Sequence, residues 1–192
     1  LQAGTSVLAV PLAGRIHEGV VYSNRDRRTQ LDKMIALLAS LGLAQPFFFV
    51  ADAYYASGKI VRGLLQQDGH LITRLKRNAV AYALPPQPTA DAPKKRGRPP
   101  TYGAKIKIAS LLDDETAFLE AQSPVYGEAQ VTLRYRAVDL LWRAAGRRVR
   151  FVIVKHPKRG TIILMSTDLT LAPMDILRLY GLRFKIEVSF KQ

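Results

Sequence analysis

An aspartate follows closely after a short apolar run that is typical of a buried, central strand. The run is Phe47 to Val50, and Asp52 lies at the carboxyl end of the predicted strand. In open α/β sheets, ligands and metal ions gather at that edge because loops and helix ends meet there. A carboxylate in this place can hold a hard divalent cation through its oxygens. Alternatively, Asp52 caps the turn or helix that follows it, and position alone leaves both interpretations open.

A second group of polar residues recurs at helical spacing near the end of the sequence. In LRLYGLRFKIEVSFKQ, Tyr180 is followed by Arg183, Glu187 and Lys191, at offsets of three, seven and eleven. At 100° per residue these positions share one face of a helix. Such a stripe is often only the edge of a solvated face. Its basic members also suit a phosphodiester backbone, and its carboxylate suits a metal ion on that backbone.

The charge of the chain points to a polyanionic partner. The 192 residues include 29 basic and 15 acidic side chains, for a net charge of +14. Thirteen of the basic residues but only four acidic ones lie between residues 129 and 192. Nucleic acid or an anionic membrane surface would fit this charge. The sequence contains neither a signal sequence nor an apolar stretch long enough to span a bilayer, so we expect a nucleic-acid partner and no membrane.

Cysteine and histidine chemistry contributes little. The chain contains no cysteine, which excludes disulfides, thiolate zinc sites and cysteine nucleophiles. Its three histidines, His17, His70 and His156, are scattered and show no metal-ligand spacing. The single tryptophan, Trp142, could stack on an unpaired base, although core packing is the simpler interpretation.

The elements that position Asp52 alternate between helix and strand. Apolar spacing predicts a helix over 31–41, with Ser23, Asn24 or Asp26 as its cap, and a second helix within 57–69. A strand is expected over 70–76, where Ile72, Arg74 and Lys76 form the side that faces water or DNA. Helix, strand, helix, strand is typical of a three-layer α/β architecture.

A proline-rich, basic stretch then interrupts the pattern. It ends in KKRGRPP, which carries Lys94, Lys95, Arg96 and Arg98. Arg-Gly-Arg-Pro in an extended segment resembles the core of an AT-hook, whose arginines lie in a narrow minor groove. The alternative is a basic solvated loop that touches phosphates without sequence preference. Either interpretation makes these four residues candidate DNA contacts.

The rest of the chain is rich in predicted strands until a last helix, which tolerates Pro173 in its first turn. We therefore expect residues 1–78 and 168–192 to form one α/β core. Residues 79–167 would then be a basic, proline-rich linker and a β-rich insertion of small-domain size.

Several stretches together resemble DDE-type transposases of bacterial insertion sequences. They are FVADAYY, LITRLKRNA, KKRGRPPTYG, ILMSTDL and LYGLRFKIEVSFKQ. Tyr180, Arg183 and Glu187 fit that family's signature of Tyr, two residues, Arg, three residues, Glu, six residues and Lys. The resemblance implies a ribonuclease-H-like catalytic core: a mixed α/β sheet flanked by helices, with a β-rich insertion before the last helix.

The resemblance also implies the chemistry. Such transposases hydrolyse a phosphodiester at the end of the element and join the freed 3′ hydroxyl to target DNA, using two Mg²⁺ (or Mn²⁺) ions held by three carboxylates. Asp52 would be the second carboxylate and Glu187 the third, both catalytic and metal-binding. Tyr180, Arg183 and Lys191 would bind the DNA backbone.

Two positions of the family pattern have no counterpart in the sequence. The first catalytic aspartate belongs to a strand before the one expected at Ser6 to Leu12, and the closing lysine of the signature would fall at position 194. We therefore expect an internal piece of a transposase that lacks the first strands of its core and is inactive alone.

Two other functions stay open: a non-catalytic DNA-binding remnant of a degenerate element, and a metal-dependent nuclease of the same fold. The expected partner is double-stranded DNA, at transposon ends and target, bound by a homo-oligomer. The expected location is the cytoplasm, in association with the nucleoid.

Overall fold

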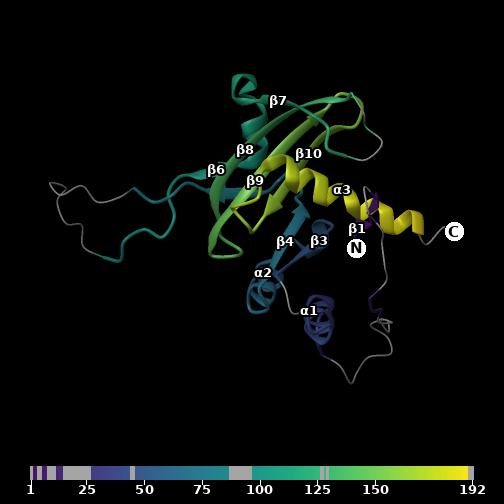
Figure 1. Cartoon of the computed structure of the whole chain (residues 1–192). Coiled ribbons are helices and arrows are strands. Elements are labelled where there is room, and N and C mark those ends of the chain that lie inside the picture. Colours follow the sequence, from purple (N-terminus) through teal and green to yellow (C-terminus); the bar gives the residue numbers. More distant parts are fainter. Residues whose placement is uncertain are drawn as a thin grey trace.

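A computed structural model describes residues 2–3, 6–7, 12–14, 27–43, 46–86, 97–125, 128 and 130–189, with the backbone alone for 2–3, 6–7 and 184–189. Figure 1 shows a broad sheet with helices packed against it. No helix in these ranges is long and apolar enough to cross a membrane.

Eight strands form the main sheet, which is mixed. The order from one edge is β3 (Phe47–Ala51), β4 (Gly69–Arg74), β10 (Gly160–Ser166), β9 (Arg147–His156), β8 (Thr132–Trp142), β5 (Val80–Tyr82) and β6 (Lys105–Lys107), with β7 (Leu119–Gln122) also paired to β8. Strands β3 and β4 are parallel, and the other pairs are antiparallel. Strands β1 (Gln2–Ala3) and β2 (Ser6–Val7) pair with each other apart from this sheet.

The central strand β9 is buried on both faces because its alternate residues enter two different cores. Phe151 and Ile153 belong to one apolar cluster, whereas Val152 and Val154 belong to the other. Successive side chains of a strand point to opposite faces, so the continuous apolar run in β9 requires cover on both sides.

Helices supply that cover. Helix α2 (Gly58–Leu65) buries Ile60, Val61 and Leu64 in the first cluster, and α1 (Gln30–Ser40) packs against α2 from outside. On the other face, α3 (Pro173–Ser189) buries Ile176 and Leu177 in the second cluster. In Figure 1, α3 (yellow) passes across β4 and β10, whereas α1 and α2 lie together on the far side of β3 and β4. The predicted three-layer arrangement is confirmed.

The helix boundaries follow from their caps. Thr29 and Asp32 form a reciprocal capping box at the start of α1, so the cap predicted at Ser23, Asn24 or Asp26 was wrong. Ser57 caps α2 through the backbone N–H of Ile60. Pro173 begins α3, as expected for a residue that lacks a backbone donor.

Strand β3 differs from its prediction as a central strand. Among the described strands it pairs with β4 alone, and Phe48 is 38% exposed at this edge. The β-rich segment shares the same sheet, because β10 pairs directly with β4. The division into a core of 1–78 and 168–192 and an insertion of 79–167 stays a prediction.

Candidate active site

The carboxyl ends of β3 and β4 lie side by side. The strands are parallel and in register, with Ala51 opposite Thr73. Asp52 therefore leaves β3 at the same edge where Arg74 ends β4. The edge predicted to gather ligands is thus formed by one acidic and several basic residues.

Asp52 is exposed and also acts as a cap. Its Oδ1 accepts a hydrogen bond of 2.9 Å from the backbone N–H of Tyr54, at the start of the short helix η1 (Ala53–Tyr55). The capping interpretation is therefore confirmed. It leaves Oδ2 without a hydrogen-bond partner among the described residues, so capping and binding do not exclude each other.

Two neighbours fix the surroundings of this carboxylate. The buried hydroxyl of Thr73 donates a hydrogen bond of 2.7 Å to the backbone oxygen of Asp52. Tyr55 packs edge-on against Phe49, with ring centroids 5.4 Å apart. Burial raises the pKa of the Tyr55 hydroxyl, and the negative charge of Asp52 raises it further. The Tyr55 hydroxyl therefore stays protonated and does not act as a base beside Asp52.

An open pocket of about 370 Å³ joins Asp52 to α3. We call it the Asp52 pocket. Its lining comes from three segments of the chain: residues 52–54 after β3, residues 74–77 at the end of β4 and beyond it, and Tyr180 and Arg183 of α3. The structure thus brings together three site residues that the sequence predicted: Asp52, Tyr180 and Arg183.

The helix orients its two contributors through packing. Tyr180 is only 4% exposed and belongs to the second apolar cluster, so its ring is held firmly. The Arg183 guanidinium carbon lies 5.9 Å from the centroid of that ring, within cation–π range. Gly181 between them faces Val125: a Cβ there would lie 3.4 Å from that side chain, which is an ordinary contact distance.

Glu187 is placed by the backbone of α3, which remains helical through Ser189. Positions 183 and 187 are four residues apart and therefore lie one above the other on the same side of a helix. Lys191 lies outside the described residues, as do Lys94, Lys95 and Arg96. Arg98 is described and exposed. The roles predicted for these residues stay predictions.

Arg74, Lys76 and Arg77 were not among the predicted site residues. The alternation of residues in the sequence correctly predicted that Arg74 and Lys76 are exposed. It also predicted an exposed Ile72, because Ile72 shares their side of the strand. Ile72 is fully buried because α3 covers that face. Arg74, at the last position of β4, and Lys76, two residues beyond it, are exposed.

The Asp52 pocket fits phosphate more completely than metal. In the described ranges, no three His, Cys, Asp or Glu side chains are grouped to hold a metal ion. Asp52 is the one carboxylate among the lining residues, and its Oδ2 fits as a single metal ligand. The other charged residues of the lining are cationic: Arg74, Lys76, Arg77 and Arg183. Any further carboxylate ligand must come from outside this described lining.

Trp142 does not serve as a base-stacking platform. It is 8% exposed and lies in the first apolar cluster, as the packing interpretation predicted. His70 contacts Thr167 and Phe48, and His156 accepts hydrogen bonds from the backbone N–H groups of Lys158 and Arg159. Neither histidine belongs to a described metal-ligand group.

The comparison with known families identifies the class of protein. The chain belongs to the DDE superfamily endonucleases, whose model matches residues 13–148, more than half of the chain. Its mixed sheet with helices on both faces agrees with the ribonuclease-H-like fold of DDE domains. No curated protein matches the chain.

Membership of this superfamily implies a DNA substrate and a transposase or nuclease role, in which divalent metal ions are generally used. The matched range includes Asp52 and the basic residues after β4. It ends before α3, so the roles of Tyr180, Arg183 and Glu187 rest on their positions in the fold.

Proposed function

We propose that the protein is a DNA transposase that cuts at the ends of an insertion sequence and joins them to target DNA. The observation that carries this proposal is the composition of the Asp52 pocket. One carboxylate at a sheet edge meets Tyr180 and Arg183 of α3 in a pocket whose other charged residues are all cationic. A phosphodiester fits there with its charge facing the basic residues and its reacting bond facing Asp52.

The residues of the Asp52 pocket and α3 have separate proposed roles. Arg183 binds a phosphate through its forked donors, and its position over the Tyr180 ring limits where that phosphate lies. Asp52 and Glu187 are the proposed ligands of Mg²⁺ or Mn²⁺. When bound, such ions activate the attacking oxygen and stabilise the leaving oxygen of an in-line displacement. The cap to Tyr54 holds the Asp52 carboxylate in one orientation.

The proposal extends to the residues that contact DNA away from the pocket. Lys191 and the basic run of Lys94, Lys95, Arg96 and Arg98 are proposed to bind the backbone of transposon or target DNA. A homo-oligomer would hold two ends together, in the cytoplasm and associated with the nucleoid.

Two other functions compete with this one. The described pocket contains a single carboxylate, which favours a DNA-binding protein without catalysis. A metal-dependent nuclease would share the same residues and stop after the cut.

A strand-transfer assay distinguishes the three. A labelled duplex that carries the element's terminal sequence is incubated with the full-length gene product, plasmid target and either Mg²⁺, Mn²⁺ or EDTA. Metal-dependent joined product supports transposition. Cut duplex without joined product supports the nuclease, and bound but uncut duplex in every metal supports the non-catalytic protein. Glu187→Gln should abolish the joined product, and full activity of that variant would refute the role of Glu187.

A further inference from the structure

Three basic residues at the end of β4 form a cluster with a rigid backbone. We call Arg74, Lys76 and Arg77 the β4 exit cluster. Between them, Leu75 is buried, and its N–H donates a hydrogen bond of 2.8 Å to the backbone oxygen of Ile163. The N–H of Ala79 closes the following turn onto the oxygen of Lys76 at 3.0 Å. The backbone is therefore fixed, whereas all three cationic side chains are exposed.

The β4 exit cluster keeps its charge. The structure records no acidic partner within 4 Å for any of its three members among the described residues. Elsewhere, six basic residues pair with four carboxylates: Arg134 and Lys155 with Glu115, Arg136 with Asp114, Arg148 and Arg150 with Asp139, and Arg159 with Glu128. The cluster therefore places three positive charges without an acidic partner next to Asp52, where a polyanion would be drawn.

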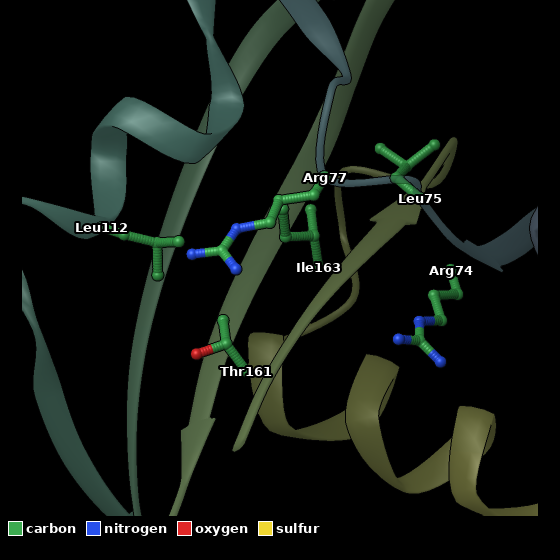
Figure 2. Close-up of a pocket in the computed structure, with 6 residues that line it drawn as sticks. All are labelled: Arg74, Leu75, Arg77, Leu112, Thr161 and Ile163. Carbon is green, nitrogen blue, oxygen red and sulfur yellow. The ribbon is translucent and has the colours of Figure 1, made fainter.

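The cluster extends past the Asp52 pocket. Arg74 also lines two adjoining cavities, of about 260 and 210 Å³. Figure 2 shows its side chain directed toward α3, whereas Arg77 extends past Ile163 toward Leu112, above Thr161. The two guanidinium groups therefore lie on different parts of one surface, which begins at Asp52.

We propose that the β4 exit cluster binds consecutive phosphates of one DNA strand beside the scissile bond. Arg74 and Lys76 take the phosphates nearest Asp52, and Arg77 takes the next along the cavity with Leu112 and Thr161. This inference rests on the proposed function in one respect, that DNA enters the Asp52 pocket. The three are positioning residues: they fix the strand, while Asp52 faces the reacting bond.

The salt dependence of binding tests this directly. Each neutralised phosphate contributes about 0.9 to the slope of log K against log salt for duplex DNA and about 0.7 for a single strand. The triple variant Arg74→Gln, Lys76→Gln, Arg77→Gln should lower that slope by about 2 to 3 and raise Kd by roughly 10- to 100-fold at 0.15 M salt. Binding is measured by fluorescence anisotropy in EDTA, so that catalysis plays no part.

A matched control separates specific contacts from bulk charge. Lys105→Gln, Lys107→Gln and Arg143→Gln together remove the same charge from exposed positions. Strand β6 carries the two lysines at the opposite edge of the sheet from β3, and Arg143 lies in the turn after β8. An equal loss in this control, or an unchanged slope in the cluster variant, would overturn the proposal.

A second readout locates the strand. Because the chain contains no cysteine, Arg77→Cys provides a single thiol for a tethered iron chelate, which cuts DNA nearby. Cuts should centre beside the scissile bond, and the same chelate on Arg143→Cys should produce none there. Scattered or identical cuts from both variants would contradict the placement.

The outcomes also separate this inference from the proposed function. If the wild-type protein binds DNA through the cluster but never cuts or joins it, the phosphate site stands and the transposase proposal fails. If the protein joins DNA while the cluster variant keeps its slope, the transposase proposal stands and this inference fails.

Discussion

The Thr73 hydroxyl donates a 2.7 Å hydrogen bond to the backbone oxygen of Asp52. The bond joins the residue that directly follows β3 to a residue near the end of β4. Thr73 directly precedes Arg74. It fixes the proposed metal-binding carboxylate and the proposed phosphate-binding cluster relative to each other. Since Thr73 is fully buried, water does not compete for this bond, and its loss has consequences for both stability and positioning.

Thr73→Val should destabilise the fold by about 1 to 2 kcal/mol, because it removes the buried hydroxyl and leaves the Asp52 oxygen with only the Tyr55 N–H. Urea unfolding measures the change. Thr73→Ser retains the hydroxyl and should restore part of the loss. A Thr73→Val protein as stable as the wild type would show that the bond contributes nothing.

Arg150 should be needed to hold the segment that leads into α3. It forms two hydrogen bonds of 2.8 Å to Asp139 and one of 2.7 Å to the backbone oxygen of Leu171. Arg150→Gln should cost about 1.5 to 3 kcal/mol of unfolding free energy. Arg148→Gln is the control, since Arg148 is more exposed and lies 3.8 Å from Asp139. It should cost less than about 1 kcal/mol, and equal losses in the two variants would contradict this account.

Glycine-to-alanine substitutions should act in opposite directions in two helices. A Cβ at Gly58 would lie 1.6 Å from the backbone oxygen of Ala144, so Gly58→Ala should destabilise by about 1 to 3 kcal/mol. A Cβ at Gly181 meets only ordinary contact with Val125, and Gly181→Ala should stabilise by about 0.5 to 1 kcal/mol through helix propensity. Thermal melts of both variants check the signs. A neutral Gly58→Ala would refute the close approach of α2 to the turn after β8.

Low pH should break the ion pair between Asp32 of α1 and Lys59 of α2. Hydrogen bonds from Lys59 and then from Thr29 lower the pKa of Asp32 from 3.8 to about 2. A lowered folded-state pKa contributes stability that is present above the unfolded value and is lost as the pH falls through the folded value. This contribution should therefore disappear between about pH 4 and pH 2. Urea midpoints across that range should fall less steeply for Asp32→Asn than for wild type; parallel curves would contradict the assignment.

The sequence predicted what depends on local pattern. Apolar spacing located α1 and α2, and the apolar run before Asp52 placed that residue at a strand end. It did not reveal that β3 is at an edge of the described sheet, because an apolar run has the same appearance wherever the strand is paired. Ile72 is buried by α3, which lies about a hundred residues later in the sequence. The alternation of residues within the strand could therefore not predict its burial.

The sequence predicted several residues of the candidate site but not how these residues are arranged in space. The helical spacing of Tyr180 and Arg183 indicated a shared face, but only the fold shows that this face meets Asp52. The Thr73 bond and the pairing of Arg150 with Asp139 join distant segments and leave no local signature. The β4 exit cluster resembled an ordinary basic strand end in the sequence, and only the structure shows that it lines the Asp52 pocket with no acidic partner within 4 Å among the described residues.

The most direct test of the central claim is single-turnover DNA cleavage by Asp52→Asn in the full-length gene product, with DNA affinity measured on the same samples. Asparagine keeps the side-chain oxygen that accepts from Tyr54, so the cap survives and only the charge is lost. Metal-dependent cleavage should fall by at least about 100-fold, while DNA affinity stays within about twofold of the wild type. Cleavage at the wild-type rate would show that the Asp52 pocket is not the active site.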